Sequence, residues 1–577
     1  MTTPHTLRSS FKPEHSGFRF LPFGNVPQLT QSPLSPQSHS ATLNEPSDAA
    51  KPTQGLPSTK QGQGLTAFET PIDSVVFSTE AKRIQQLQQP PSQEAPLLSK
   101  TPLSVKAFNP TSLGSGITPS LLAMGSPAYL LQDATLPSSS LQVLLPINPE
   151  LRESTLMGGI LTDGSRETQS FKLHLATQGI DVTATVGDQH IGMMINGPNG
   201  KEPEMLQALN QLLLHPNVDA STFNINKKNT LLSMLNLYNA TGTSSDELLE
   251  QSLFGPEHPH VKSTQQMIRD VEDQQAQQVL AVLQKGLSDP SAIQWVFVSK
   301  LPVETQLDLL NTYLPPEAWQ PVQKKVLLPS DASTAEVIQA SKSHTHLPPA
   351  TPIAPPKQPL LVTDNSLERL QMKRIWQAPA IGSPDELTFA VLSQLLRGMN
   401  GDLFTELRTK QGLVYSVQSA YSKHPVVGEF RVVADVDIDK WPALAQGMKT
   451  AIEHVCHTPP DTEDMERVIR SMVYALRESK RHPEEQSNAM AHRIDAGLTP
   501  QTIDERIAKL LTITPEDIQQ VAQTYLGSQA WQVTVVSGPE YALKQRFPNQ
   551  PRVSRSVVKQ MDEAKHAPEV SIYDALA

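Results

Sequence analysis

Apolar and polar residues follow two different periods along this chain. Between Asp461 and Arg481 apolar residues recur three and four positions apart, which predicts an amphipathic helix. The apolar face of that helix comprises Met465, Val468, Ile469, Met472, Val473 and Leu476. The stretches IDVTATVGDQHIGMMI and LVYSVQSAYSKHPVVGEFRVVADV alternate instead and predict pairs of β-strands, and AWQVTVVSG predicts a last strand.

Both periods meet in the stretch FTELRTKQGLVYSV. Phe404–Arg408 has the pattern of a helix end, Gln411–Gly412 is a stop signal, and Leu413–Val417 is β-prone. Arg408 thus stands just before a predicted turn and Tyr415 just after it. Two interpretations are open for this segment taken alone. Arg408 is a surface charge and Tyr415 a half-buried aromatic, or the two residues act together as a pair.

Two further stretches carry helix start signals. Ser383-Pro384-Asp385-Glu386 has the form of a capping box with proline at the first helical position, and Thr514-Pro515-Glu516-Asp517 opens another helix in a similar way.

The chain contains an internal repeat. At one constant offset, Phe171, Gln178, Gly179 and Ile180 match Phe404, Gln411, Gly412 and Leu413. In each copy a helix comes before this segment, an alternating strand pair follows, and longer helices come next. This order predicts an α+β fold of two homologous domains, each an antiparallel-rich sheet with helices packed on one face.

Composition divides the 577 residues into five parts. Residues 1–104 are rich in Pro, Ser and Gln and are expected to be disordered, because they hold too little apolar surface to offset the entropy of ordering. Residues 105–335 form the first predicted domain, 336–357 a Pro-rich linker, and 358–548 the second domain. Residues 549–577 are charged and have the composition of a tail.

Charge and cysteine content narrow the function classes. The net charge of −11 speaks against a nucleic-acid or anionic-membrane partner. The single cysteine, Cys456, lies between His454 and His457 in a spacing unlike that of zinc ligands and is interpreted as a small residue on a helix flank. No apolar run is long enough to span a membrane, and no signal-peptide pattern is found, so a cytoplasmic location is expected.

Taken in order, three segments resemble the insulinase/pitrilysin-type zinc metallopeptidases and their non-catalytic relatives. The most specific is LLRGMNGDLFTELRTKQGLVYSV in the second domain. TLMGGILTDGS resembles a family helix, and LFGPEHPH resembles a family segment in which tyrosine usually stands at the place of His260. The resemblance covers both domains but not the N-terminal hundred residues, and it implies that each is part of a clam-shell half.

The zinc site that the resemblance implies is degenerate. Active members hold zinc with H-x-x-E-H on one helix, the glutamate acting as general base. The matching positions include Thr155, Gly158 and Gly159, and the motif is absent from the whole sequence. At the place of the third ligand stand Ser233 and Met234, which do not replace a carboxylate on zinc. No cofactor is therefore expected on this chain.

The second domain keeps the other part of the family's site. In the family, an Arg and a Tyr at the spacing of Arg408 and Tyr415 hold the substrate backbone beside the metal. At the matching places in the first domain stand Leu175 and Val182, whose side chains carry neither a positive charge nor a hydroxyl group. The resemblance thus implies a substrate-binding role for Arg408 and Tyr415, and the alternative is that they are relics.

Two functions follow from this pattern. The first is an auxiliary substrate-binding subunit of a two-chain zinc metallopeptidase, a heterodimer in which a zinc-bearing partner of the same family completes the site for a peptide. The second is a non-catalytic binding or assembly protein, like the core subunits that relatives contribute to large complexes. An independent hydrolase is disfavoured, because no G-x-S-x-G motif occurs and Cys456 lies in no recognisable catalytic setting.

The N-terminal hundred residues should be dispensable for folding, because they lack an apolar pattern. Limited proteolysis of the full chain should remove them and leave a stable core that begins near residue 100. A core fragment that aggregates while the full chain stays dispersed would contradict this prediction.

Overall fold

The computed structural model describes residues 116–146, 161–216, 218–240, 243–261, 263–315, 347–398 and 401–554. The N-terminal region predicted to be disordered, the degenerate positions Thr155, Gly158 and Gly159, residues 336–346 of the predicted linker and most of the predicted tail lie outside the described residues.

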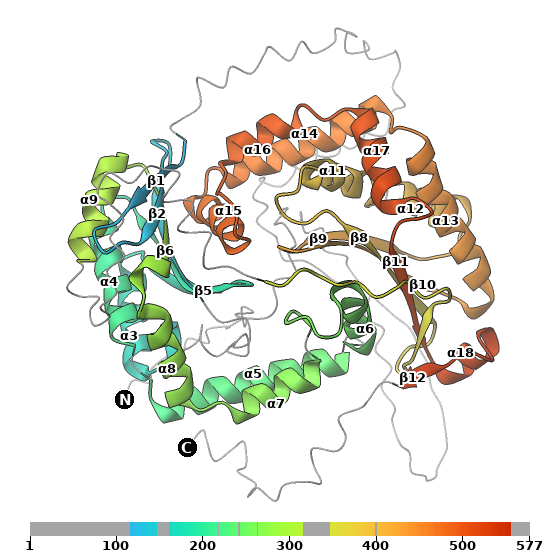
Figure 1. Cartoon of the computed structure of the whole chain (residues 1–577), viewed down its shortest axis with the longest axis horizontal. Helices are drawn as coiled ribbons and strands as arrows, with labels where there is room; N and C mark the ends of the chain where they lie inside the picture. The colour runs from blue at the N-terminus through green and yellow to red at the C-terminus, as the bar shows by residue number, and fades with distance from the viewer. Residues whose placement is uncertain are drawn as a thin grey trace, which may run out of the picture. The chain divides into compact units, whose positions relative to one another are not determined.

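The first half is built on a mixed six-stranded sheet (Figure 1). Its strands are β1 (Thr118–Leu121), β2 (Pro127–Gln132), β3 (Ser138–Pro146), β4 (Asp181–Val186), β5 (His190–Pro198) and β6 (Gln294–Ser299). They lie in the order β1-β2-β6-β3-β5-β4, and every pair is antiparallel except β2–β6. The helices are α3 (Arg166–Thr177), α4 (Glu202–Leu214), α5 (Ala220–Ala240), α6 (Thr243–Phe254), α7 (Thr264–Asp273), α8 (Ala276–Leu287), the 3-10 turn η3 (Pro290–Ala292) and α9 (Val303–Tyr313).

The second half repeats this plan. Its strands are β7 (Leu360–Thr363), β8 (Leu370–Ala378), β9 (Val417–Lys423), β10 (Gly428–Val436), β11 (Gln532–Gly538) and β12 (Arg552–Ser554), in the order β12-β7-β11-β8-β10-β9. β7 pairs in parallel with β11 and β12, and the other pairs are antiparallel. The helical elements are α11 (Glu386–Leu396), α12 (Asp402–Phe404), the π-helical turn η5 (Thr405–Lys410), the 3-10 turn η6 (Ile438–Lys440), α13 (Trp441–His457), α14 (Thr462–Ser479), α15 (Pro483–Asp495), α16 (Ile503–Leu510), α17 (Pro515–Leu526) and α18 (Glu540–Arg546). The predicted α+β fold with two similar, antiparallel-rich sheets is confirmed.

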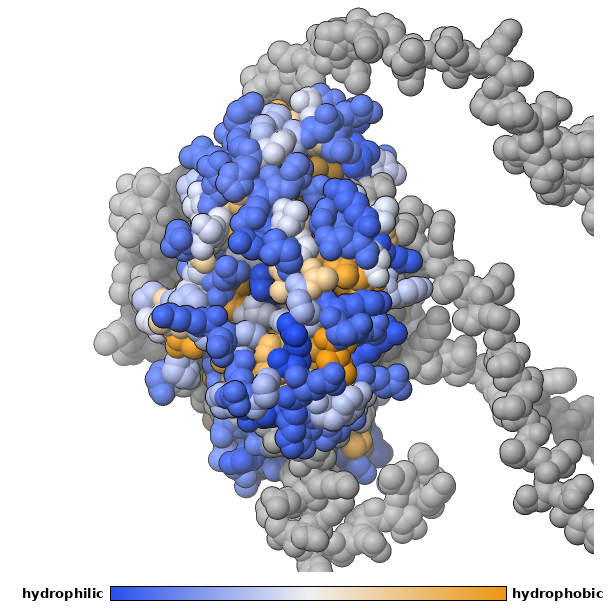
Figure 2. Space-filling model, turned by 90° about the vertical axis from the view of Figure 1, so that its right-hand side faces the viewer, coloured by the Kyte–Doolittle hydropathy of each residue, from blue (hydrophilic) through white to orange (hydrophobic). Residues whose placement is uncertain are grey.

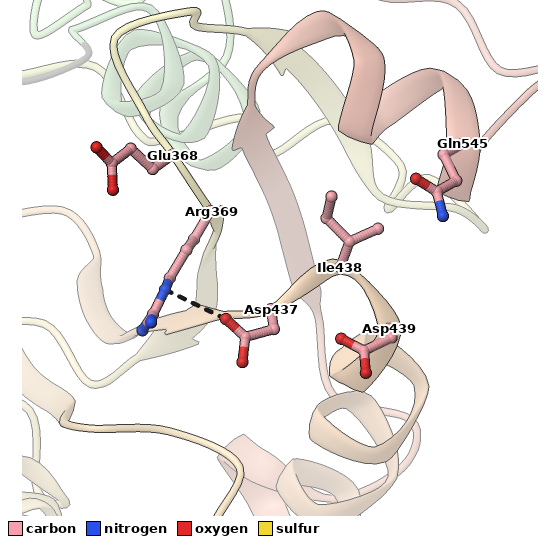
Figure 3. A pocket seen from close by; sticks show the side chains of 6 residues that line it. All are labelled: Glu368, Arg369, Asp437, Ile438, Asp439 and Gln545. Carbon is pink, nitrogen blue, oxygen red and sulfur yellow. Dashed lines mark ion pairs between the residues drawn. The ribbon is translucent and has the colours of Figure 1, made fainter.

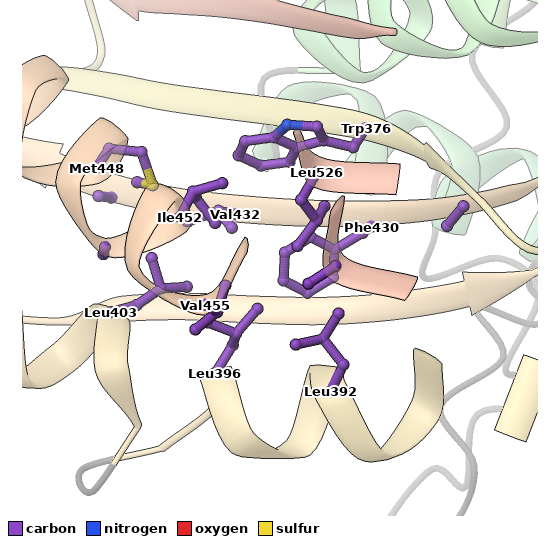
Figure 4. Packing of buried hydrophobic residues seen from close by; sticks show 14 of the residues in the cluster. Trp376, Leu392, Leu396, Leu403, Phe430, Val432, Met448, Ile452, Val455 and Leu526 are labelled. Atoms are coloured by element: carbon purple, nitrogen blue, oxygen red, sulfur yellow. The ribbon is translucent and has the colours of Figure 1, made fainter. Parts of the chain in front are cut away.

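Each half has its main core between one face of its sheet and its own helices. In the second half, Trp376 and Phe430 of the sheet pack against Leu392 of α11, Ile452 of α13 and Leu526 of α17 (Figure 4). The predicted apolar face of the helix at 461–481 is confirmed, since all six of its residues belong to this core or pack against it.

The opposite face of each sheet is covered by a helix from the other half, which the sequence did not predict. α15 of the second half packs on β3, β5 and β6, where Met490 and Ile494 meet Leu144 and Val296. α6 of the first half packs on β8 and β11, where Leu253 joins a core with residues of those strands. The prediction that helices pack on one face of each sheet is therefore incomplete. Strand β6, with the sequence QWVFVS, is buried over its whole length because both faces of its sheet are covered.

One carboxylate fastens α15 to the first half. Asp495, at the C-terminal end of α15, accepts the backbone N–H groups of Asp188 and Gln189 in the β4–β5 turn, at 2.6 and 2.9 Å. The Nδ1 of buried His190 lies 3.0 Å from the same carboxylate. A Cβ on Gly187 would come within 2.6 Å of the Asp495 carboxyl carbon, so the glycine leaves room for this contact.

The α6 contact is held by charge. Asp246 of α6 accepts hydrogen bonds from Lys373 of β8 at 2.9 Å and from Arg431 of β10 at 2.7 Å. Burial alone would lower the pKa of Arg431, but Glu429 and Asp246 raise it above its ordinary value. Arg431 therefore stays charged, and its pairing with two carboxylates offsets the cost of desolvation.

Three local predictions need correction. The strand predicted at Leu413–Val417 begins only at Val417, because the preceding residues form the turn after η5. The capping box at Ser383 is wrong: α11 begins at Glu386, whose carboxylate instead accepts the N–H of Gly382 at 2.7 Å. The box of Thr514 with Asp517 is confirmed. Arg552–Ser554 forms β12, so ordered structure extends into the segment assigned to a tail.

Replacing Asp495 by alanine should destabilise the protein strongly. It leaves two backbone N–H groups and a buried imidazole N–H without their acceptor, and about 1–3 kcal/mol is lost for each buried group left unpaired. We expect a loss of about 3 kcal/mol or more in the free energy of unfolding, measured by denaturant titration. The matched control is Asp439→Ala in exposed η6, which should change it by about 0.5 kcal/mol or less. Equal effects of the two substitutions would show that the Asp495 contact does not hold the halves together.

Candidate functional site

Arg408 lies in the π-helical turn η5, which continues the short helix α12. The turn closes with the N–H of Gly412 donating to the carbonyl of Arg408 at 3.0 Å and that of Leu413 donating to Leu407 at 2.9 Å. Gly412 has a φ of +60°, which favours glycine at this point. Single π-helical turns inside helices are rare and are frequent at functional sites.

The π-helical turn shifts which side chain is buried. In the first half, Leu175 is 4% exposed and the preceding His174 is exposed. In the second half, Leu407 is fully buried, and Arg408, the match of Leu175, lies towards the surface. A Cβ on Gly447 of α13 would lie 2.8 Å from Leu407, so that glycine lets the turn sit close against α13.

Arg408 is held between two aromatic rings. Its guanidinium carbon lies 5.1 Å from the ring centre of Phe404 and 4.8 Å from that of Tyr415. Its Nη1 donates to the backbone carbonyl of Tyr415 at 2.5 Å. The structure thus brings the two predicted site residues together, and Phe404 is a third member that the sequence analysis missed although it stands four residues before Arg408, one helical turn away.

Tyr415 is 78% exposed, so the interpretation as a half-buried aromatic is wrong. The chain before and after it is anchored by buried Val414 and by β9. Among the described residues, none is bonded to its hydroxyl. The phenol is therefore free to donate to an external acceptor, while Arg408 fixes the backbone that carries it.

The carboxylates near the turn are not partners of Arg408. The carboxylate of Glu406 accepts from Lys410 at 3.0 Å and from Gln411 at 2.7 Å, and these hydrogen bonds lower its pKa. Burial raises the pKa of Asp402 in α12, an effect that His454 opposes. Neither of these two carboxylates forms an ion pair with Arg408, whose guanidinium instead contacts the two rings and the carbonyl of Tyr415.

The matching positions of the first half are core residues. Leu175 of α3 and Val182 of β4 are each 4% exposed and belong to the first half's apolar core. Neither side chain has a polar group, and both are buried, so at these two described positions the first half has no counterpart of the Arg408–Tyr415 pair.

Metal ligands are not assembled in the described ranges. Within them no group of three or more His, Cys, Asp or Glu side chains is placed to hold a metal ion. On α5, Ser233 is exposed and Met234 is buried in the core. The positions Thr155, Gly158 and Gly159 lie outside the described residues, so the absence of zinc from this chain stays a prediction.

Cys456 is a core residue. It is 4% exposed on α13, and its Sγ lies 3.4 Å from the carbonyl of Ala522 on α17. Burial, followed by the charge of Glu453, raises its pKa to about 11, so the thiol is unreactive. Neighbouring His454 and His457 are exposed on the other side of the helix.

A pocket of about 310 Å³ opens between the β7–β8 connection, η6 and α18 (Figure 3). Its lining residues are Glu368, Arg369, Asp437, Ile438, Asp439 and Gln545. The Nε of Arg369 lies 3.2 Å from Asp437, whose pKa is lowered by the hydrogen bond from Lys440. The sequence analysis predicted none of these residues as part of a site.

The surface shows no broad apolar face in the view of Figure 2, where apolar residues form small groups between hydrophilic ones. None of the helices in the described part of the chain is long and apolar enough to cross a membrane.

Comparison with known proteins gives the class of this fold. Residues 275–472, which include Arg408 and Tyr415, match the family described as peptidase M16 inactive domain. An uncharacterized zinc protease of Streptomyces coelicolor is 28% identical over 160 residues, a match that covers 26% of this chain and 33% of that protein. The matched segment is thus about a third of that relative's length.

Solved structures share the fold. A conserved protein from Enterococcus faecalis V583 superposes with a TM-score of 0.59 at 16% identity, covering 74% of this chain and 99% of the other. A peptidase M16 inactive domain from Pseudomonas fluorescens gives 0.58 at 13% identity, covering 73% and 98%. The periplasmic protease PqqL from Escherichia coli gives 0.57 at 13% identity, covering 81% of this chain and 51% of that protein.

These findings confirm the resemblance to the insulinase/pitrilysin-type peptidases: both halves have an M16-type peptidase fold, and residues 275–472 match the inactive domain of that family. An inactive domain of this type fits a non-catalytic homologue.

Replacing Tyr415 by alanine should leave stability nearly unchanged, because the side chain is 78% exposed. Only its contact with Arg408 is lost, and exposed cation–π contacts contribute about 0.5–1 kcal/mol. The matched comparison is Tyr421→Ala, since Tyr421 packs against the core and donates to the carbonyl of Pro379 at 2.6 Å. We expect thermal unfolding to shift by several degrees for Tyr421→Ala and much less for Tyr415→Ala, and the reverse order would contradict the geometry.

Proposed function

We propose that this chain is the auxiliary, substrate-binding subunit of a two-chain zinc metallopeptidase. The observation that carries the proposal is the Arg408–Tyr415 pair: an exposed phenol on a backbone that the arginine holds in place. The partner would be a zinc-bearing subunit of the same family, so zinc is expected on the partner and the complex is expected to be a heterodimer that acts on a peptide.

The chemistry of the pair suits a peptide carbonyl. A tyrosine hydroxyl donates a hydrogen bond to a carbonyl oxygen as that oxygen gains negative charge, and such donors stabilise the transition state of amide hydrolysis. The guanidinium of Arg408 lies under the Tyr415 ring at 4.8 Å and adds a fixed positive charge nearby. Both groups reach the surface from one rigid turn, which reduces the reorganisation needed when substrate binds.

The match to an inactive domain supports a non-catalytic role, and it includes both residues of the pair. The distant relative described as a zinc protease supports a connection to zinc-dependent proteolysis. The degenerate positions in the first half explain why a second chain is needed for catalysis in this proposal.

The second candidate is a non-catalytic binding or assembly protein. One observation favours it. Arg408 donates a hydrogen bond to the carbonyl of Tyr415 and contacts two aromatic rings, and these contacts would also stabilise the turn. In that case the pair is a structural relic, and substitutions would affect the turn but no reaction.

The location expected from the sequence, the cytoplasm, stays a prediction. One protein of similar fold is a periplasmic protease, and fractionation of cells that express the tagged chain would distinguish the two compartments.

Purified alone, the chain should neither hold stoichiometric zinc nor cleave peptides, because the sequence lacks H-x-x-E-H. Elemental analysis and a peptidase assay with and without chelator measure this directly. About one tightly bound zinc per chain, or chelator-sensitive cleavage, would overturn the proposal. Co-purification with the tagged full chain should yield a subunit that contains H-x-x-E-H, whereas a large assembly without proteolytic activity would favour the second candidate.

In the complex with that subunit, Tyr415→Phe should lower turnover by about 100-fold, because it removes one hydroxyl aimed at the developing oxyanion. Arg408→Ala should give a similar or smaller loss through poorer substrate positioning. The matched control is Tyr474→Phe on α14, where the side chain is 67% exposed and turnover should not change. Unchanged turnover of Tyr415→Phe, at unchanged thermal stability, would mark the pair as a relic.

A further inference from the structure

Away from the Arg408–Tyr415 site, positively charged side chains lie together around the carboxylate of Glu386, which is buried at the start of α11. Lys423, at the end of β9, donates to one oxygen of that carboxylate at 2.8 Å, and Arg506 of α16 lies 3.9 Å from the same oxygen. The other oxygen accepts the backbone N–H of Gly382. One buried carboxylate thus faces two cations.

A third cation, Arg493, belongs to the last turn of α15, the helix that packs on the first sheet. Its Nε donates to the carbonyl of Thr499 at 2.8 Å, in the loop after α15. That loop packs against the β8–α11 connection, since a Cβ on Gly382 would lie 2.3 Å from the side chain of Leu498. Arg493 and Glu386 therefore lie on two segments that are in contact.

The three cations are close enough to act on one another. Burial lowers the pKa of Lys423, and the charges of Arg506 and Arg493 lower it further, although Glu386 opposes them. Burial and the charge of Arg506 likewise lower the pKa of Arg493, against the charges of Glu386 and Glu505. We call Lys423, Arg493 and Arg506 the cation cluster. Because like charges repel, holding the cluster together costs free energy.

The carboxylates beside the cation cluster do not balance it. Glu386 and Glu505 are the two whose charges act on Arg493, and Glu505 also accepts the backbone N–H and the hydroxyl of Thr502 in the capping box of α16. Asp495, two residues after Arg493, is bonded to the β4–β5 turn of the first half. Among the three cations and the two glutamates, one positive charge is therefore left without a partner.

The two guanidinium groups also have unused donors. Within the described part of the chain, Arg506 has the 3.9 Å ion pair with Glu386 as its side-chain contact, and Arg493 donates through Nε alone. The side chains of Arg506 and Lys423 are 25% and 23% exposed, so the cluster is open to solvent. A guanidinium presents its N–H groups as a planar fork that matches two oxygens of a carboxylate or a phosphate.

We propose that the cation cluster is a binding site for a small oxyanion, a carboxylate or a phosphate group, held between Arg493 and Arg506. The anion supplies the missing negative charge and accepts hydrogen bonds from the guanidinium N–H groups that bond no described residue. Lys423 stays paired with Glu386 and adds its charge from the side. Because the two arginines come from α15 and α16, the bound anion links the helix that covers the first sheet to the body of the second half. The proposal does not depend on the role of the Arg408–Tyr415 pair.

Isothermal titration calorimetry of the full chain with inorganic phosphate, and in parallel with acetate, tests the proposal. Both titrations are run at about pH 7, with sodium chloride holding the ionic strength constant so that screening does not change. We expect saturable binding of at least one anion with a dissociation constant of about 1 mM or lower, as two charge-assisted contacts imply. Binding of phosphate alone identifies a phosphate site, and binding of acetate identifies a site for a carboxylate group.

Arg506→Gln leaves the pair of Lys423 with Glu386 intact and should weaken binding about tenfold or more, because a hydrogen-bonded charge is lost. Arg493→Gln should have the same effect and serves as a second variant if the first does not fold, which thermal unfolding without anion reveals. The matched control is Arg470→Gln on α14, which removes the same charge from a side chain that is 59% exposed and should bind as wild type.

Three results would each overturn the proposal. The first is the absence of saturable binding of either anion to the wild-type chain. The second is equal binding by the wild type and by both cluster variants, which would place the anion elsewhere. The third is an equal loss of binding in the Arg470→Gln control, which would show that overall charge, and not this cluster, attracts the anion.

Discussion

The structure depends on the reciprocal covering of two sheets. Each sheet buries one face under its own helices and the other under a helix from the opposite half, α15 on the first sheet and α6 on the second. A sheet that is apolar on both faces is stable only when both are covered, since burial contributes about 25 cal/mol for each Å² of apolar surface. Because the second cover of each sheet comes from the opposite half, the two repeats form one compact unit.

The same packing also positions two hairpin turns. The ends of the exchanged helices meet the hairpin turns of the opposite half: Asp495 accepts the N–H groups of the β4–β5 turn, and Phe254 meets His424 in the β9–β10 turn. β9 continues directly from the segment that carries Tyr415. The position of the site therefore rests on a strand whose far end is held by a helix of the other half.

Much of the fold could be read from the sequence. Sharp periodicity predicted α14 and its buried face, and side-chain capping at Thr514 predicted α17. The packing of α15 on the sheet of the other half could not be predicted. This helix buries only a few apolar residues, among them Met490 and Ile494, and their periodicity does not indicate which sheet they contact. The one available signal was the continuous apolar run of β6, typical of a strand covered on both faces. At the site, sequence predicted Arg408 and Tyr415 but not Phe404 or the π-helical turn, since a single such turn leaves no periodic mark.

The contrast between the halves shows how one fold position becomes either core or site. Leu175 and Arg408 occupy matching places in the repeat, yet the leucine is buried and the arginine reaches the surface. The difference lies in the backbone: the π-helical turn buries Leu407, one residue earlier, and the missing Cβ of Gly447 makes room for it. An arginine placed at Leu175 without that turn would enter an apolar core, where an unpaired charge is very costly. The turn and the arginine therefore have to occur together, and the exposed phenol that Arg408 braces is what this local distortion of the helix achieves.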